Sequence, residues 1–180
     1  ATLKQVRIAS PFFDPACKAF ERLFEDLQPE SVCLYIQPGQ HNLDPRRLRA
    51  ALARYKGEFE VRALHLDGRR LHAKAMQFEA EQGFWLLTGS ANFSVAGMML
   101  PARLGNAELG ILRHEAERRH FDGWWGELRQ HSSEIDISWD VPSAGEEPPD
   151  EQPSTRPDIL LKSATLSDSG KLQLDCLGQL

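Results

Sequence analysis

Three short runs of β-branched and apolar residues, with helix-like segments between them, constrain most strongly what this chain can fold into. The runs cover residues 6–10, 31–38 and 59–66 and read VRIAS, SVCLYIQP and FEVRALHL. Apolar runs of this length, bounded by proline, glycine and polar residues, are typical of buried strands. Strands that alternate with helices predict an α/β domain with a mixed, largely parallel sheet flanked by helices.

The segments between these runs carry helix signals. Asp14 and Pro15 are expected to form the N-cap and first turn of one helix, and Asp44 is expected to cap a second. A third helix, weakened by two glycines, is expected over 115–130. The apolar side chains at helical spacing are Phe20, Leu23, Phe24 and Leu27 in the first helix and Leu48, Leu52 and Tyr55 in the second.

Further strands are expected in the middle of the chain. Residues 71–79 and 83–89 read as a pair of strands joined by the polar turn from Glu79 to Gly83, and residues 106–112 read as another. These strands carry the polar residues discussed below.

The composition changes sharply after residue 140. Residues 141–157 are rich in proline, acidic and small residues, so they predict an extended linker. Residues 158–180 contain β-type runs around a turn at 168–170, but a segment of this size cannot form its own core. We therefore expect a domain over 1–140, a linker over 141–157, and over 158–180 the start of a β-rich module or an arm that packs back.

The charge and cysteine content limit the partners. A formal net charge of -5 predicts no broad basic surface for nucleic acid, so any anion site must be local. Cys17, Cys33 and Cys176 lack C-x-x-C spacing, which favours neither a disulfide framework nor a zinc site and fits a reduced, cytoplasmic setting. No apolar run approaches the roughly 20 residues needed to span a bilayer. The chain begins with Ala-Thr-Leu-Lys instead of Met, so we expect it to be a piece of a longer protein.

A histidine and a lysine two residues apart form the first candidate for chemistry. In a strand this spacing puts the side chains of His72 and Lys74 on the same face. A neutral imidazole can attack an electrophile, and an adjacent ammonium can hold the negative oxygens that the electrophile carries. A phosphodiester fits that description.

Two later segments offer polar partners for such a pair. Gly89, Ser90 and Asn92 lie in a tight turn, where glycine permits close approach and the polar side chains can bind phosphoryl oxygens. Asn106 and Glu108 alternate in an expected strand that returns to the same edge. The Glu108 carboxylate is expected to accept a hydrogen bond from one imidazole nitrogen and so leave the other free.

The ordered set of H-x-K, G-S-x-N and N-x-E resembles the phospholipase D superfamily, over roughly residues 6–137. Its signature, often written H-x-K-x4-D, matches His72 and Lys74, with Glu79 where the family usually has a structural Asp. The matching segments are 72–74, 89–92 and 106–108, and IASPFFD at 8–14 looks like the family's first strand and loop.

The resemblance implies a metal-independent phosphodiesterase that acts through a phosphohistidine on His72 and needs no cofactor. Such proteins bring two H-x-K sites together across a twofold or pseudo-twofold axis, one histidine acting as nucleophile and the other as general acid. This chain has one copy, so the resemblance implies either a homodimer or a second half in the missing part of a parent protein. The sequence has no carboxylate cluster suited to two-metal catalysis.

Three functions remain open at this stage. The first is a nuclease domain of a larger DNA-processing protein, the second is a phospholipase or phosphatidyl transferase, and the third is a catalytically silent module that binds nucleic acid or protein. The lack of a basic amphipathic helix or long apolar loop disfavours the lipid substrate. Trp124 and Trp125 are expected to pack a terminal helix instead of forming a base-stacking platform, and the five other histidines are expected to be non-catalytic.

Overall fold

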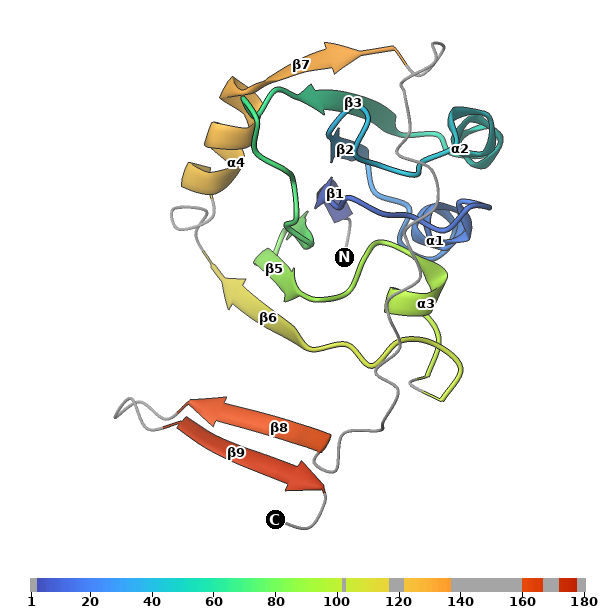
Figure 1. Cartoon of the computed structure of the whole chain (residues 1–180). Helices are drawn as coiled ribbons and strands as arrows, with labels where there is room; N and C mark the ends of the chain where they lie inside the picture. Colours follow the sequence, from blue (N-terminus) through green and yellow to red (C-terminus); the bar gives the residue numbers. More distant parts are fainter. Residues whose placement is uncertain (1–2, 102, 117–121, 137–159, 167–171, 178–180) are drawn as a thin grey trace. The chain divides into compact units, whose positions relative to one another are not determined.

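The computed structural model describes residues 3–101, 103–116, 122–136, 160–166 and 172–177 (Figure 1). The chain divides into two compact units, Ala1–Glu147 and Pro148–Leu180. The strands of the first unit are β1 (Leu3–Ala9), β2 (Ser31–Ile36), β3 (Glu58–Leu64), β4 (Ala75–Ala80), β5 (Gly83–Gly89), β6 (Gly110–Glu115) and β7 (Ser132–Ile135). Its helical segments are α1 (Lys18–Arg22), the π-helical turn η1 (Leu23–Leu27), α2 (Pro45–Leu52), α3 (Val95–Met98) and α4 (Asp122–Gln130).

The strands of the first unit form one seven-stranded sheet in the order β6-β5-β4-β1-β2-β3-β7. β1, β2 and β3 are parallel neighbours, while β4, β5, β6 and β7 pair antiparallel. The short β4–β5 connection has Gly83 at φ +123°, a conformation that favours glycine. The predicted α/β class and mixed sheet flanked by helices are confirmed, with a parallel centre made by the three strands that alternate with α1 and α2.

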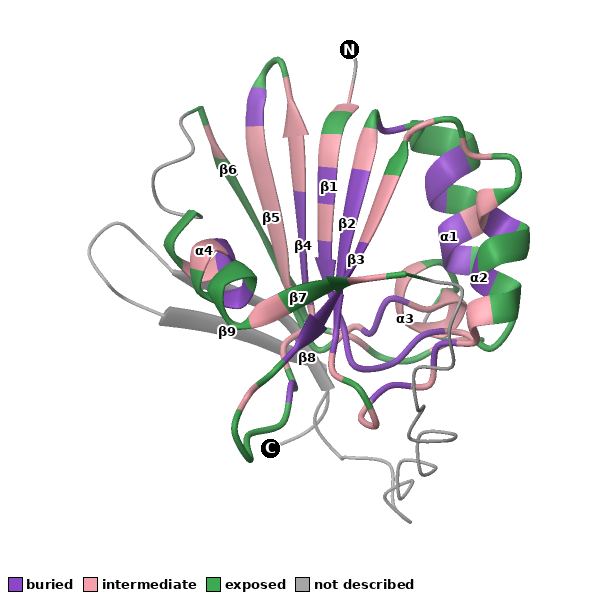
Figure 2. Ribbon diagram, turned by 90° about the horizontal axis from the view of Figure 1, so that it is seen from above, coloured by how far each residue is buried: buried purple, intermediate pink, exposed green. Residues whose placement is uncertain are grey.

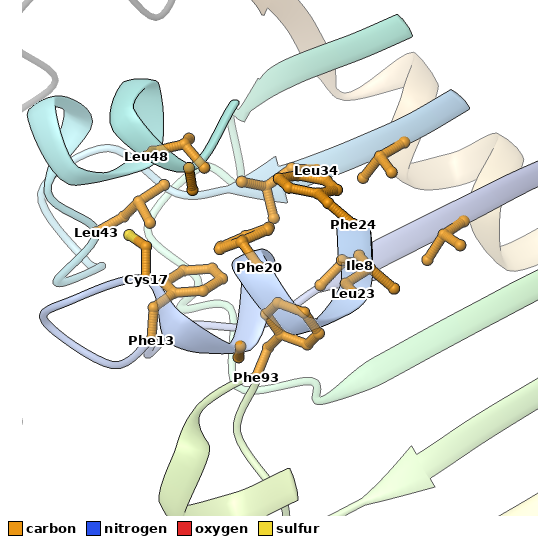
Figure 3. Close-up of a cluster of buried hydrophobic side chains, with 14 of the residues drawn as sticks. Ile8, Phe13, Cys17, Phe20, Leu23, Phe24, Leu34, Leu43, Leu48 and Phe93 are labelled. Carbon is orange, nitrogen blue, oxygen red and sulfur yellow. The ribbon is translucent and has the colours of Figure 1, made fainter. Parts of the chain in front are cut away.

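One face of the sheet is covered by α1 and α2 and the other by α4 (Figure 2). Phe20 of α1 lies at the centre of the first core, with its ring 4.7 Å from that of Phe93 and 5.8 Å from that of Phe13 (Figure 3). Such aromatic pairs contribute about 0.5–1.5 kcal/mol beyond the burial of their area. On the other face, Tyr35 of β2 packs against Trp125 of α4 with 5.6 Å between ring centroids. These two cores fix the sheet that carries the candidate site.

The first helix begins later than the sequence predicts. Asp14 is not its N-cap, because α1 starts at Lys18 after Cys17, which has φ +55°. The Asp14 carboxylate still accepts hydrogen bonds from the backbone N–H groups of Lys18 and Ala19, at 2.6 and 3.1 Å. The first backbone N–H groups of α1 therefore find their acceptor in a side chain about one turn earlier, and not in the residue directly before the helix. The predicted N-cap of the second helix is confirmed, because the Asp44 side chain accepts hydrogen bonds from backbone N–H groups at the start of α2.

The strands that carry the polar motifs are shorter than predicted. His72 and Lys74 precede β4 in an extended segment, and Asn106 and Glu108 precede β6 in a loop. Within the described residues, the third helix begins at Asp122 instead of Glu115. The edge strand β7 was not predicted, because its four polar-rich residues lack an apolar alternation.

The second unit contains the antiparallel strands β8 (Leu160–Leu166) and β9 (Leu172–Leu177), which pair as the predicted hairpin. The expected linker, residues 141–157, lies outside the described residues. Among the helices of the described residues, none is both long enough and apolar enough to cross a membrane.

Candidate active site

The segment that carries His72 and Lys74 is held in place by the side chain of Gln37, which follows β2. Gln37 Nε2 donates a hydrogen bond to the Arg69 carbonyl at 2.7 Å, and Gln37 Oε1 accepts one from the Leu71 N–H at 2.6 Å. Leu71 is buried in the core under α4, whereas His72 is exposed. The burial of Leu71 and the two hydrogen bonds of Gln37, here called the Gln37 clamp, together fix the backbone around His72.

His72 and Lys74 lie side by side. Lys74 Nζ is 3.3 Å from His72 Nε2, within reach to donate a hydrogen bond to that nitrogen. This contact agrees with the same-face arrangement predicted from the i, i+2 spacing, although the segment is not part of a strand. The side-chain nitrogen of Lys74 therefore lies beside a ring nitrogen of an exposed imidazole.

The pair opens into a cleft of about 430 Å³ between the sheet and α4. Its wall includes His72, Lys74, Thr88 and Gly89 from the sheet side and Trp124 from α4. The backbone N–H of Gly89 donates to the Lys74 carbonyl at 3.3 Å, so the end of β5 lies against the histidine segment. The structure thus brings the H-x-K pair and Gly89, the first residue of the G-S-x-N motif, to one cleft.

Ser90, Asn106 and Glu108 form a hydrogen-bonded cluster next to Gly89. Ser90 Oγ donates to Glu108 Oε2 and accepts from the Leu109 N–H at 2.9 Å. Asn106 Nδ2 donates to Glu108 Oε1 at 3.1 Å. Both carboxylate oxygens of Glu108 are therefore engaged. The hydrogen bond expected between Glu108 and His72 does not occur among the contacts of the described residues, because Ser90 and Asn106 take its place.

Gly89 has a different structural role from the one predicted. A Cβ atom at this position would lie 2.1 Å from the carbonyl oxygen of Leu109. The missing side chain allows β5 and β6 to pair closely at Gly89 and Gly110, so the close approach is to the chain's own backbone.

Asn92 is turned into the protein. The residue is 8% exposed and absent from the cleft wall, and its Oδ1 has no hydrogen-bond partner among the described residues. The next residue, Phe93, anchors the turn, because its N–H donates to Ser10 Oγ at 3.1 Å and its ring packs on Phe20. The core contact of Phe93 fixes the turn but leaves Asn92 behind the cleft, apart from the other motif residues.

The cleft wall includes one lysine, Lys74, and two arginines lie close to it in the sequence, in a chain of net negative charge. Arg69 and Arg70 precede His72 and are exposed, and the Arg70 guanidinium lies 5.8 Å above the ring centroid of Phe12. No carboxylate occurs among the described residues that line the cleft. A lysine in a wall without a described carboxylate is compatible with the local anion site that the net charge predicts. No group of three or more His, Cys, Asp or Glu side chains among the described residues is placed to hold a metal ion.

Two cleft residues were missed from the sequence. Leu86 and Thr88 of β5 both line the cleft. Because residues two apart in a strand share a face, the alternation of the strand predicts that Leu86 and Thr88 lie on the same side of the sheet. Trp124 packs against the core under α4 as expected, but it also lines the cleft, as does the buried Trp125. Adjacent residues on a helix point in different directions, so the sequence predicts that the two tryptophans have different surroundings. It does not predict what the more exposed one contacts.

Comparisons with known proteins found no matching family model and no matching curated protein. Among solved structures, the chain is similar to NucT from Helicobacter pylori, with 12% identity and a TM-score of 0.46 over 73% of this chain and 82% of that one. It is similar to polyphosphate kinase from Porphyromonas gingivalis, with 12% identity and a TM-score of 0.48 over 81% of this chain and 21% of that one. It is also similar to yeast tyrosyl-DNA phosphodiesterase, with 14% identity and a TM-score of 0.40 over 73% of this chain and 36% of that one. At these TM-scores the likenesses carry no weight for function.

Proposed function

We propose that this chain is a phospholipase D-like phosphodiesterase that cleaves nucleic acid, as the nuclease domain of a larger DNA-processing protein. The contact between His72 Nε2 and Lys74 Nζ, 3.3 Å long at the mouth of a cleft, carries the proposal. A histidine beside a lysine supports the proposal, because a nucleophile that attacks an anionic target needs a cation next to it.

The reaction has two steps. His72 Nε2 attacks phosphorus, and an N–P bond forms while the P–O bond to the leaving oxygen breaks. A second histidine gives that oxygen a proton as general acid. Water then attacks phosphorus and passes its proton to the second histidine, the N–P bond breaks, and His72 is restored.

The other motif residues have distinct roles in this proposal. Lys74 neutralises the phosphoryl oxygens, so no divalent ion is needed. Ser90 and Asn106 hold both oxygens of Glu108 beside Gly89, where the cluster shapes the phosphate side of the cleft and its polar groups can reach the substrate. A role for Asn92 in binding phosphate requires its buried side chain to turn outward.

The charge pattern favours nucleic acid over lipid as the substrate. Arg69, Arg70 and Lys74 provide three cations within six residues, beside a cleft whose described wall has no carboxylate. A polyanionic backbone interacts with such a cluster at several phosphates, whereas a zwitterionic lipid presents only one.

A second copy of the chain supplies the general acid in this proposal. Residues 104–112, which include Glu108, contain several exposed apolar residues. They lie on the edge strand β6, which is exposed along most of its length in Figure 2, and in the loop before it. The exposed fractions are 67% for Leu104, 58% for Leu109, 68% for Ile111 and 64% for Leu112. Exposed apolar groups that gather beside an active site support an interface there.

The proposal is tested by turnover of labelled single- and double-stranded DNA, RNA and phosphatidylcholine vesicles, all in the presence of EDTA. We expect DNA cleavage and an acid-labile nucleotide adduct on the protein after rapid quench. His72→Ala should lose the adduct and reduce the rate by about 10³-fold or more, because the covalent route is gone. Lys74→Ala should also be severe, since a charged donor to phosphoryl oxygen contributes several kcal/mol in a water-poor site.

Matched controls are His131→Ala and Lys56→Ala, which remove an exposed histidine and an exposed lysine away from the cleft. Both should keep wild-type rates. A His72→Ala variant that forms the same adduct, or turns over at the wild-type rate, would show that His72 is not the nucleophile. Loss of activity in EDTA with rescue by magnesium would exclude the proposed chemistry.

A further inference from the structure

The two adjacent tryptophans of α4 have different environments. Trp125 is 2% exposed and packs on Tyr35 of β2, with 5.6 Å between the ring centroids. Trp124 is partly exposed and lines the same cleft as His72 and Lys74. Trp125 also contributes to the cleft wall, but it is buried against Tyr35, so Trp124 is the more accessible of the two indoles at the site.

Trp124 is held in place by its neighbour. The two indoles meet edge to face, with ring centroids 4.5 Å apart and planes at 67°. Because Trp125 is fixed in the core, this contact limits the orientations that Trp124 can adopt. A positioned indole in a cleft wall loses little conformational entropy when a ligand binds.

The cleft fits a flat, uncharged or anionic group more closely than a cationic one. Its volume of about 430 Å³ lies in the range of small-molecule sites. Aromatic side chains bind nucleobases by stacking and quaternary ammonium groups by cation–π contact. The ammonium of Lys74 repels the second class of ligand, and no carboxylate in the described cleft wall balances a bound cation.

We propose that Trp124 is a substrate-positioning residue that stacks on a nucleobase next to the phosphate held by His72 and Lys74. This deepens the proposed function and rests on it for the identity of the reacting phosphate. Trp124 binds the base without reading its sequence, because every base has a π-face.

Equilibrium binding separates this inference from catalysis. The probes are thymidine 5′-monophosphate and deoxyribose 5-phosphate, which share a phosphate and a sugar but differ in the base. Trp124→Leu should weaken binding of the nucleotide by roughly tenfold or more, within the range of base stacking, and leave the sugar phosphate unchanged. Trp124→Phe should retain most of the nucleotide affinity. Lys74→Ala should weaken binding of both probes.

The matched control is Trp85→Leu, since Trp85 stacks on His114 of the edge strand and is not part of the cleft wall. It should bind both probes as the wild type does. Equal losses for both probes in Trp124→Leu, or no affinity for the nucleotide in the wild type, would overturn the inference. So would a Trp124-dependent affinity for phosphocholine in place of the nucleotide, which would assign the cleft to a cationic headgroup. A wild type that binds the nucleotide through Trp124 but cleaves no diester would overturn only the proposed function.

A second measurement uses the wild-type chain and does not depend on the stability of a variant. The chain contains four tryptophans, so incorporation of 5-fluorotryptophan gives four ¹⁹F signals. The Trp124 signal, assigned from Trp124→Phe, should shift on saturation with thymidine 5′-monophosphate but not with deoxyribose 5-phosphate. A Trp124 signal that does not respond to the nucleotide would also exclude stacking.

Discussion

His41 is a buried histidine whose charge state affects stability instead of catalysis. Its side chain is 1% exposed, and its Nδ1 accepts a hydrogen bond from the Leu43 N–H at 3.1 Å. Burial lowers the pKa of His41 to about 4. Because the folded pKa lies below the ordinary value of about 6.5, the unfolded chain binds a proton that the folded chain does not between these pH values.

The free energy of unfolding should therefore fall as the pH is lowered from about 6.5 towards 4. The contribution of His41 should be fully present above pH 6.5 and should decrease by up to about 3 kcal/mol across this window. Urea unfolding of the wild type and His41→Asn at several pH values measures it, since Asn can still accept from the Leu43 N–H. The variant should have a flatter pH profile between pH 6.5 and 4, whereas His131→Asn, at an exposed position, should keep the wild-type slope. Identical slopes for wild type and His41→Asn would assign the acid sensitivity to other groups.

At the same scale, the identities of the candidate site residues could be predicted more readily than their contacts. The i, i+2 spacing is sufficient to predict that His72 and Lys74 are neighbours, because any extended backbone gives that result. The partners of Glu108 depend on where the loop before β6 lies, which is set by the pairing of β6 with β5. The direction of Asn92 depends on the core contact of Phe93. The partners of Glu108 and the direction of Asn92 both depend on contacts between distant parts of the chain, so the spacing of residues within a motif cannot predict them.

Among the elements, the β5–β6 pair depends most directly on one residue. Gly89→Ala places a Cβ atom 2.1 Å from the Leu109 carbonyl oxygen, and backbone cannot move aside as a side-chain tip can. We expect a loss of about 1–3 kcal/mol in the free energy of unfolding, as for other overpacked sites, together with displacement of Ser90 and Glu108. Chemical denaturation and the rate of diester cleavage should both report the change.

Gly123→Ala in α4 is the matched control. A Cβ atom at Gly123 meets nothing within 4 Å, so this variant should be neutral or more stable by about 0.5–1 kcal/mol. If Gly89→Ala had the same free energy of unfolding as Gly123→Ala, then β5 and β6 could move apart without a loss of stability. The close pairing at Gly89 would then not contribute to the fold.

Most strands and helices could be predicted from their local patterns, but several boundaries could not. β2 and α2 match their predictions because the first is a continuous apolar run and the second has an aspartate cap followed by proline. α1 starts late because Cys17 adopts a left-handed conformation that no sequence signal marks. β7 forms only because β3 offers a free edge, so its pairing is a property of the assembled sheet.

For the whole molecule, the proposed dimer gives a test that requires no substrate. Leu112→Glu and Ile111→Glu each put a charge on an exposed apolar residue of β6, one on either face of the edge strand, where it would be buried in an interface along that edge. Sedimentation should show a dimer for the wild type and a shift of both variants to monomer, and diester cleavage should fall with the dimer fraction. Folding should be little affected, because both side chains are exposed.

Leu27→Glu is the control for this experiment, since Leu27 is also exposed, at 48%, but lies on η1. It should remain dimeric and active. A wild-type chain that is strictly monomeric at full turnover would refute the requirement for a second copy.

The reactive segment depends on a small number of contacts that lie far apart in the sequence. Leu71 is held by the Gln37 amide and by its own burial, and the Lys74 carbonyl accepts a hydrogen bond from the Gly89 N–H of β5. A designer who moved the reactive pair into another scaffold would therefore have to carry Gln37, the pocket for Leu71 and the end of β5 with it.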